Sequence, residues 1–129
     1  MNPAPDRRTL KESMLTVREP DDFGFALRNF LDRFRRAPHI NLLEDEPEGL
    51  AKLLDDDGLS DAYLASAAAL LCQEQGFSCP EWVDRPNRVF KRPWFAAKTP
   101  NLKAILLQES PAAFRVRNLF VSANALSRA

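Results

Sequence analysis

The sequence predicts an all-α fold: an irregular bundle of about five to seven helices in a single domain. The chain of 129 residues contains four glycines but ten prolines. Prolines start and stop helices, whereas hairpin turns favour glycine. Apolar residues recur at spacings of three and four in the clearest segments, and no strand-like alternation appears between residues 38 and 76. A chain of this length can bury the core of one domain.

The N-terminal residues 1–20 are expected to form a flexible, disordered leader, and residues 21–129 the helical domain. The leader is polar and contains Pro3, Pro5 and Pro20. It has no apolar segment of the kind that a secretory signal requires. No stretch of the chain approaches 18 apolar residues, which excludes a membrane span. Two cysteines are too few for a disulfide framework, so we expect reduced thiols in a cytoplasmic protein.

The first strong helix prediction begins after Pro20, with Asp21 or Asp22 as its cap, and ends before Pro38. Its charged residues fall mostly opposite the apolar stripe, and its last turn is cationic, which suits the helix dipole. The stripe consists of Phe23, Ala26, Leu27, Phe30, Leu31 and Phe34. This helix is expected to form one wall of the core.

Three helical pieces are expected in the middle of the chain. Residues 40–43 can form one turn, and Pro47 starts a short helix that stops near Gly58. Ser60 then caps a longer helix that ends at Gly76, where glycine suits the left-handed position beyond a helix. The alanines of this longer helix allow a neighbouring helix to approach closely.

The C-terminal third is predicted to close the core. Three prolines break residues 77–95 into short turns, and Thr99-Pro100 is a cap followed by a proline at the first helical position. Ser110-Pro111 and Ser122 suggest two further helix starts, although "FRVR" and "LFV" also fit extended chain. The expected core comprises Phe23, Leu27, Phe30, Phe34, Leu64, Leu71, Trp82, Ile105, Leu106, Phe114 and Phe120.

Charge is distributed unevenly although the formal net charge is zero. Residues 38–84 contain eleven acidic residues and one basic residue, a net −10, whereas residues 85–129 contain nine basic and one acidic, a net +8. The basic segment can pair with the acidic one in the same chain or in a second copy. Alternatively, its mixture of cations and aromatic rings suits nucleic-acid binding, with Arg88, Lys91, Arg92, Arg115 and Arg117 as the candidate contacts.

No constellation of residues points to catalysis, a metal ion or a cofactor. The chain has one histidine, His39, and no second pair of cysteines or histidines at zinc-ligand spacing. No glycine-rich phosphate loop or serine elbow is present, and the carboxylates do not follow the calcium-loop pattern. We therefore expect a non-enzymatic protein without a cofactor.

The segment "RPWF…PNLKAILLQESPAAFRVRNLFVSANALSRA", about residues 92–129, resembles the ending of small uncharacterised bacterial proteins. These share a Pro-Trp-Phe element, a helix, a Glu-Ser-Pro-x-x-Phe-Arg stretch and a similar close, and "DAYLASAAALL" matches more loosely. The family is similar to helical proteins encoded beside predicted nucleotidyltransferases, in the manner of toxin–antitoxin pairs. The resemblance implies a protein partner and carries no active site.

These observations together predict a cytoplasmic protein-interaction module, with an antitoxin-like member of a bacterial gene pair as the specific form. Phe25 falls off the apolar stripe of its helix and is a candidate contact, because aromatic residues are favoured at interfaces. The candidate partner-binding residues are Phe25, Trp94, Phe95 and Arg115. The partner can be the product of a neighbouring gene or a second copy in a homodimer, and nucleic-acid binding is the alternative function.

Overall fold

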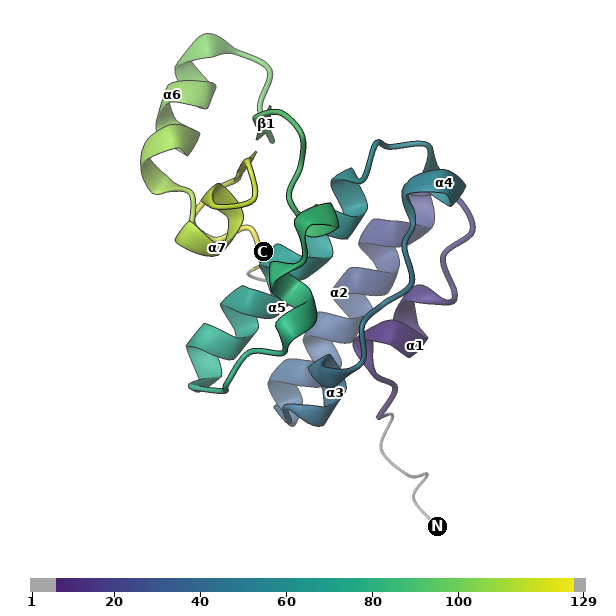
Figure 1. Ribbon diagram of the computed structural model, residues 1–129. Coiled ribbons are helices and arrows are strands. Elements are labelled where there is room, and N and C mark those ends of the chain that lie inside the picture. Colours follow the sequence, from purple (N-terminus) through teal and green to yellow (C-terminus); the bar gives the residue numbers. More distant parts are fainter. Residues whose placement is uncertain (1–6, 127–129) are drawn as a thin grey trace. The chain divides into compact units, whose positions relative to one another are not determined.

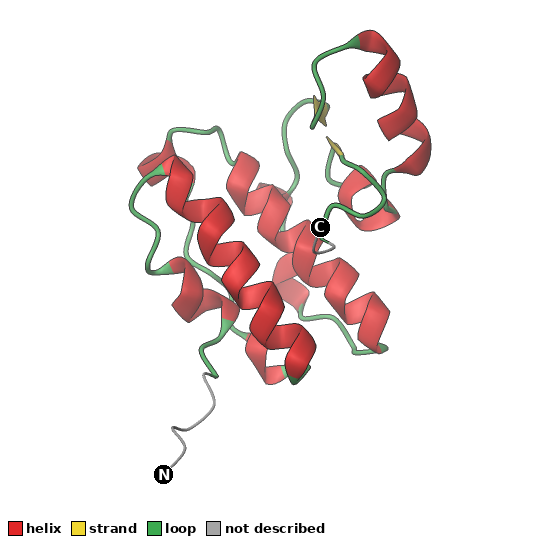
Figure 2. Ribbon diagram, turned by 180° about the vertical axis from the view of Figure 1, so that it is seen from behind, coloured by secondary structure: helices red, strands yellow, loops and turns green. Residues whose placement is uncertain are grey.

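The computed structural model describes residues 7–126 and confirms the all-α class. Seven α-helices, two 3-10 helices and two strands of two residues each occur in this range (Figures 1 and 2). Among the described residues, no helix is long and apolar enough to cross a membrane. The chain divides into two compact units, Met1–Gly49 (unit 1) and Leu50–Ala129 (unit 2), whereas the sequence suggested a boundary at residue 20.

Part of the expected leader is an ordered helix. The short helix α1 (Leu10–Met14) carries a capping box, in which Thr9 Oγ1 accepts from the Glu12 amide at 3.1 Å and Glu12 Oε1 accepts from the Thr9 amide at 3.0 Å. Its segment buries Leu10, Met14 and Val17. The prediction of a flexible leader is therefore corrected for this segment, and residues 1–6 lie outside the described part of the chain.

Helix α2 (Pro20–Arg36) buries the predicted stripe from Ala26 to Phe34, whereas Phe23, also predicted for the core, is only half-buried. Its start differs slightly from the prediction: Glu19 is the capping position, and Asp22 Oδ2 accepts from the amides of Arg18 and Glu19 at 2.9 and 3.1 Å. Arg33 does not simply face solvent, because its Nη2 donates to Ser13 Oγ at 2.6 Å and so joins α2 to the α1 segment. Helix α3 (Asn41–Glu44) adds the buried Leu43 to unit 1.

Unit 2 is built around α5 (Leu59–Gln75), which follows the short α4 (Ala51–Leu54). Helix α4 starts four residues later than the proline at position 47 suggested. The N-cap position of α5 is Gly58 and not the predicted Ser60, and the carboxylate of Asp56 accepts from the amides of Gly58 and Ser60 at 3.0 and 2.9 Å. Gly76 ends α5 with φ of 69°, the left-handed conformation predicted for this glycine.

The remaining elements of unit 2 pack on α5 and on one another. They are the 3-10 helices η1 (Glu81–Asp84) and η2 (Pro86–Arg88), strand β1 (Trp94–Phe95), helices α6 (Pro100–Glu109) and α7 (Ala112–Arg115), and strand β2 (Leu119–Phe120). The strands pair in parallel, Trp94 beside Leu119 and Phe95 beside Phe120 (Figure 2). The chain therefore returns to β1 after passing through α6 and α7.

The C-terminal third does close the core of unit 2, as the sequence predicted. Phe114 is fully buried, and its ring contacts Tyr63 of α5 edge-on at 5.1 Å between centroids. Leu119, Val121 and Leu126 are also buried. The helix expected after Ser122 is absent and a turn replaces it, while residues 127–129 are not described. Between Ser110 and Leu126, the only strand is β2.

Candidate protein-docking surface on helix α6

Helix α6 forms where the sequence places a strong start and stop. Thr99 is its N-cap, with Thr99 Oγ1 accepting from the Leu102 amide at 3.3 Å, and Pro100 occupies the first helical position. At the other end the Ser110 amide donates to Leu106 O at 3.0 Å, and Pro111 prevents further helix. The helix is thus defined locally, independently of how much of it is buried.

Only a narrow strip of α6 is packed against unit 2. Leu106 is its one buried residue, and the neighbouring element is β2. Lys103 Nζ lies 5.7 Å from the centroid of the Phe95 ring, a cation–π contact that adds a second attachment. Figure 1 shows α6 standing away from α5, joined to the rest of unit 2 through the β1 and α7 segments.

Three large aliphatic side chains of α6 remain half-exposed: Leu102 and Ile105 at 50%, and Leu107 at 49%. Leu102 and Ile105 are three residues apart and lie on one side of the helix, whereas Leu107 lies on the other side of the Leu106 strip. We call these three residues the α6 surface. The prediction that Ile105 belongs to the core is wrong, because α6 turns only its Leu106 strip inward.

The four candidate partner-binding residues are divided between the two units. Phe25 is on α2 in unit 1, where it is 63% exposed and lines a hollow of about 300 Å³ together with Asn29 and Arg33. Trp94 and Phe95 are half-buried in β1, and Arg115 is exposed on α7, all in unit 2. The structure therefore brings three of the four into one unit.

Phe95 is occupied by contacts within unit 2. Its ring stacks on Phe120 at 4.7 Å between centroids, in addition to the contact with Lys103. The Phe95 ring therefore supports α6 from within unit 2. A partner could stack on this ring only by displacing Phe120 or Lys103. The sequence did contain an indication of the α6 surface, because this helix has more large aliphatic residues than one buried helical face can hold.

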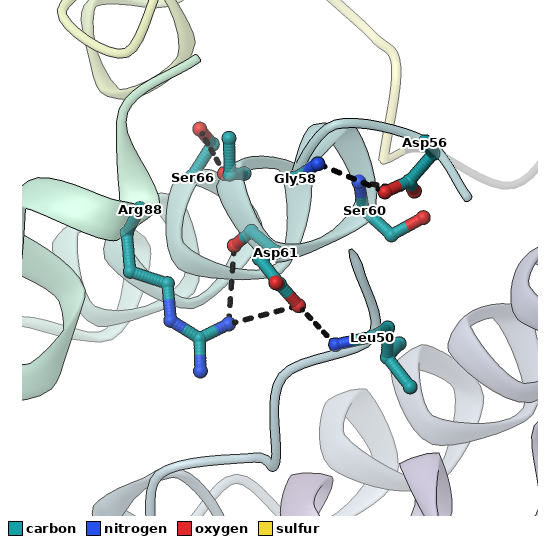
Figure 3. Close-up of polar contacts among 8 residues, drawn as sticks. Leu50, Asp56, Gly58, Ser60, Asp61, Ser66 and Arg88 are labelled. Carbon is teal, nitrogen blue, oxygen red and sulfur yellow. Dashed lines mark hydrogen bonds and ion pairs between the residues drawn. The ribbon is translucent and has the colours of Figure 1, made fainter. Parts of the chain in front are cut away.

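Arg88, a candidate nucleic-acid contact, is buried and cannot reach a phosphate from its position. It is only 1% exposed, and its Nη1 donates to Asp61 O at 3.2 Å and lies 3.7 Å from Asp61 Oδ1 (Figure 3). Its guanidinium lies 5.0 Å from the centroid of the Trp82 ring. Asp61 Oδ1 also accepts from the Leu50 amide at 2.8 Å. This network holds the 50–61 and 82–88 segments together.

Arg117 is likewise a structural residue, 4% exposed. Its Nε and Nη2 donate to Val83 O at 3.1 and 2.9 Å, and its Nη1 donates to Ala113 O at 2.6 Å. Its Nη2 lies 3.3 Å from Asp84 Oδ1. Burial lowers the pKa of Arg117, and the nearby Asp84 opposes that effect. Both buried arginines therefore have to be removed from the proposed nucleic-acid contacts.

The other three basic candidates, Lys91, Arg92 and Arg115, are exposed. Arg92 is partly engaged, because its Nη2 forms an ion pair with Asp57 Oδ2 at 3.2 Å and its guanidinium lies 5.0 Å from the Phe90 centroid. Lys91 lines a hollow of about 540 Å³ together with Lys52 and Asp55, so that the hollow carries both signs of charge. The hollow beside Lys91 is therefore not uniformly basic.

His39 serves a local structural contact. Its exposed ring accepts a hydrogen bond from the Asn41 amide at Nδ1, at 3.1 Å, at the start of α3. Within residues 7–126, no group of three or more histidine, cysteine, aspartate or glutamate side chains could hold a metal ion. The half-exposed aliphatic side chains of α6 therefore form the candidate docking surface. Comparisons of this chain with protein-family models, with curated proteins and with solved structures gave no match.

Proposed function

We propose that this chain is a non-enzymatic, cytoplasmic protein-interaction module and that the α6 surface is its docking site. The observation that carries the proposal is the half-exposure of Leu102, Ile105 and Leu107 on one short helix. Fully burying such a side chain contributes about 1.5–3 kcal/mol, so roughly half of that remains available at each position. A partner that covers the Leu102 and Ile105 side of α6 would gain this contribution at those two positions.

The charges around α6 indicate what the partner presents. Lys98 and Lys103 are exposed near the N-terminal end of α6. The one carboxylate of the helix, Glu109, accepts from the Ala123 amide at 3.3 Å and so interacts within unit 2. A complementary partner offers an apolar helix face bordered by acidic residues, because opposite charges at the rim favour association and correct orientation.

The specific partner that we propose is the protein encoded by the neighbouring gene, in the manner of an antitoxin-like member of a bacterial gene pair. This part of the proposal rests on the likeness of residues 92–129 to proteins encoded in such pairs. That segment includes the whole of α6, its Thr99 cap and both strands at its base. The segment that carries the likeness is therefore also the one that exposes aliphatic side chains.

The test measures binding of the purified neighbouring-gene product by calorimetry, with wild-type protein and with Leu102→Glu and Ile105→Glu. Each substitution is expected to weaken binding at least thirtyfold, roughly the 2 kcal/mol of an interface hot spot. Leu53→Glu is the matched control, because Leu53 is also a half-exposed leucine of a helix in unit 2, at 51%. It is expected to bind as wild type does.

Two results would overturn this proposal. The first is an absence of binding, or binding that Leu102→Glu and Ile105→Glu leave unchanged. The second is a wild-type homodimer in sedimentation analysis that these two substitutions separate and Leu53→Glu does not. That outcome would assign the α6 surface to a second copy of the chain instead of a different protein.

A further inference from the structure

The two cysteines of the chain lie together at the end of α5. Cys72 is in the last turn of α5, and Gly76 reverses the chain direction with φ of 69°. The Phe77 amide donates back to Cys72 O at 2.9 Å, which fixes this reversal. The following residues bring Cys79 back to Cys72, so that the two thiol side chains interact with each other. Sequence spacing alone, seven residues across a glycine, did not establish this contact.

The two thiols have different surroundings. Cys72 is buried, at 2% exposure, whereas Cys79 is exposed, and both are free thiols. Burial, together with the neighbouring Cys79 thiol, raises the pKa of Cys72 to about 12. Desolvation of the sulfur also raises the pKa of Cys79, but the hydrogen bond from Cys72 lowers it. Cys79 is thus the thiol that ionises first and the one that a reagent can reach.

We propose that Cys72 and Cys79 form an intramolecular disulfide when the protein meets a peroxide, with Cys79 oxidised first and Cys72 as the resolving thiol. The sulfur of the Cys79 thiolate attacks one oxygen of hydrogen peroxide and breaks the O–O bond, giving a sulfenic acid and, after protonation, water. The Cys72 sulfur then bonds to the Cys79 sulfur. The sulfenic hydroxyl leaves with the Cys72 proton as a second water, so two thiols lose two electrons to the peroxide.

The contact between the thiols is what makes the second step efficient. A resolving thiol already beside the sulfenic sulfur reacts as an intramolecular group, at a high effective concentration. No third cysteine exists in the chain to compete. The raised pKa of both groups keeps the first step slow at neutral pH, since the thiolate is the reactive form. The pair therefore responds to strong or prolonged oxidation.

The disulfide would link the segment that follows α5 covalently to the end of that helix. It closes a short ring across Gly76, and the η1 residues immediately beyond it, Val83 and Asp84, hold the buried Arg117. Cross-linking two residues limits the freedom of the unfolded chain. Oxidation should thus raise the melting temperature of the protein, and a thiol reductant should reverse the rise.

The experiment uses the full chain, reduced and then treated with hydrogen peroxide, and reads intact mass. The expected product is a monomer lighter by the two lost hydrogens, about 2 Da, that a dithiol reductant restores. At pH values below the pKa of Cys79, its rate of formation should increase about tenfold for each unit by which the pH is raised, because the fraction of thiolate increases by that factor. A product of higher mass carrying two or three oxygens, or a disulfide-linked dimer, would overturn the proposal.

Serine variants assign the two roles. With Cys72→Ser, Cys79 should stop at the sulfenic acid and form an adduct with a dimedone reagent. Cys79→Ser should give no adduct, since Cys72 is buried. The reverse pattern would contradict the assignment of roles. The wild-type mass change does not depend on either variant, so it tests the disulfide even where a serine perturbs folding.

Discussion

At the scale of single residues, two arginines decide much of the structure of unit 2. Arg88 and Arg117 each bind backbone carbonyls as well as a carboxylate, and so connect segments far apart in sequence. Arginine suits this position because its planar group offers several fixed donors. Nothing in the local sequence distinguishes these two from exposed Lys91 or Arg92, since burial depends on segments that fold over them.

Replacing Arg88 by methionine is expected to destabilise the protein by about 3–5 kcal/mol, because Asp61 would remain buried without its cation. Arg92→Met is the matched control: it removes an arginine–aspartate pair in which both side chains are more than half exposed, worth at most about 1 kcal/mol. Urea denaturation measures both. Equal losses in the two variants would show that burial of the Asp61–Arg88 pair has no energetic consequence.

Asp61 gives a prediction about pH. Burial raises its pKa above the ordinary 3.8, which the Leu50 hydrogen bond and the Arg88 charge counteract only in part. A carboxyl with a raised native pKa favours folding when protonated, so its contribution is complete below pH 3.8 and is lost as pH rises through the native pKa. The free energy of unfolding of wild type minus that of Asp61→Asn should fall across that window. A flat or rising difference would refute the sign.

At the scale of elements, the sequence predicted the long helices well because their determinants are local. The apolar stripe of α2, the Gly76 stop of α5 and the Thr99-Pro100 start of α6 can be read directly from the sequence, whereas the cap of α5 was wrongly predicted at Ser60. The shorter elements depend on distant partners. Ser110 illustrates this, because its hydroxyl donates to Leu119 O at 3.2 Å and accepts from the Val121 amide at 3.1 Å instead of capping a helix.

The candidate site was only half predictable for a related reason. A helix face that packs in the core and one that packs on a partner have the same spacing of apolar residues, so the pattern of α6 could not separate them. Ile105 was consequently assigned to the core, and its 50% exposure became evident only with the surrounding elements in place. The burial of Phe114 and Trp82 was predicted correctly, since few positions in a small protein leave such rings exposed.

The cap of α6 can be tested separately from its surface. Thr99→Ala removes the acceptor of the Leu102 amide and should destabilise the helix by about 1 kcal/mol, whereas Thr99→Ser keeps the oxygen and should cost less. Hydrogen exchange of the α6 amides measures the local effect. Unchanged protection in Thr99→Ala would mean that packing on β2, and not the cap, holds the helix.

At the scale of the whole molecule, the opposite charges of the middle and the end of the chain meet within unit 2. The ion pairs Arg88–Asp61, Arg92–Asp57 and Arg117–Asp84 each join the basic C-terminal segment to the acidic middle segment. This agrees with the expectation that the two segments pair in one chain. Among the described residues of the basic segment, Arg88 and Arg117 are buried, which lowers the charge offered to a polyanion.

Binding of random duplex DNA is therefore expected to be weaker than the range of about 10⁻⁴ to 10⁻⁶ M that non-specific DNA-binding proteins show at physiological salt. Fluorescence anisotropy at low and at physiological salt measures this. Tight binding that salt weakens steeply, and that a Lys91→Ala, Arg92→Ala, Arg115→Ala triple variant abolishes, would favour the nucleic-acid function. Arg88 and Arg117 are unsuitable for this test because their removal disturbs the fold.

The pairing of β1 with β2 has a consequence for how this protein can change. The segment between β1 and β2, which contains α6, has its two ends joined by the strand pairing. Trp94 N donates to Asn118 O at 2.8 Å, and Ala96 N donates to Phe120 O at 3.0 Å. The segment between β1 and β2 is therefore an insertion whose two ends are held together by the strand pairing. Evolution or an engineer can exchange its outward residues, and so alter what the protein recognises, while the rest of unit 2 keeps its framework.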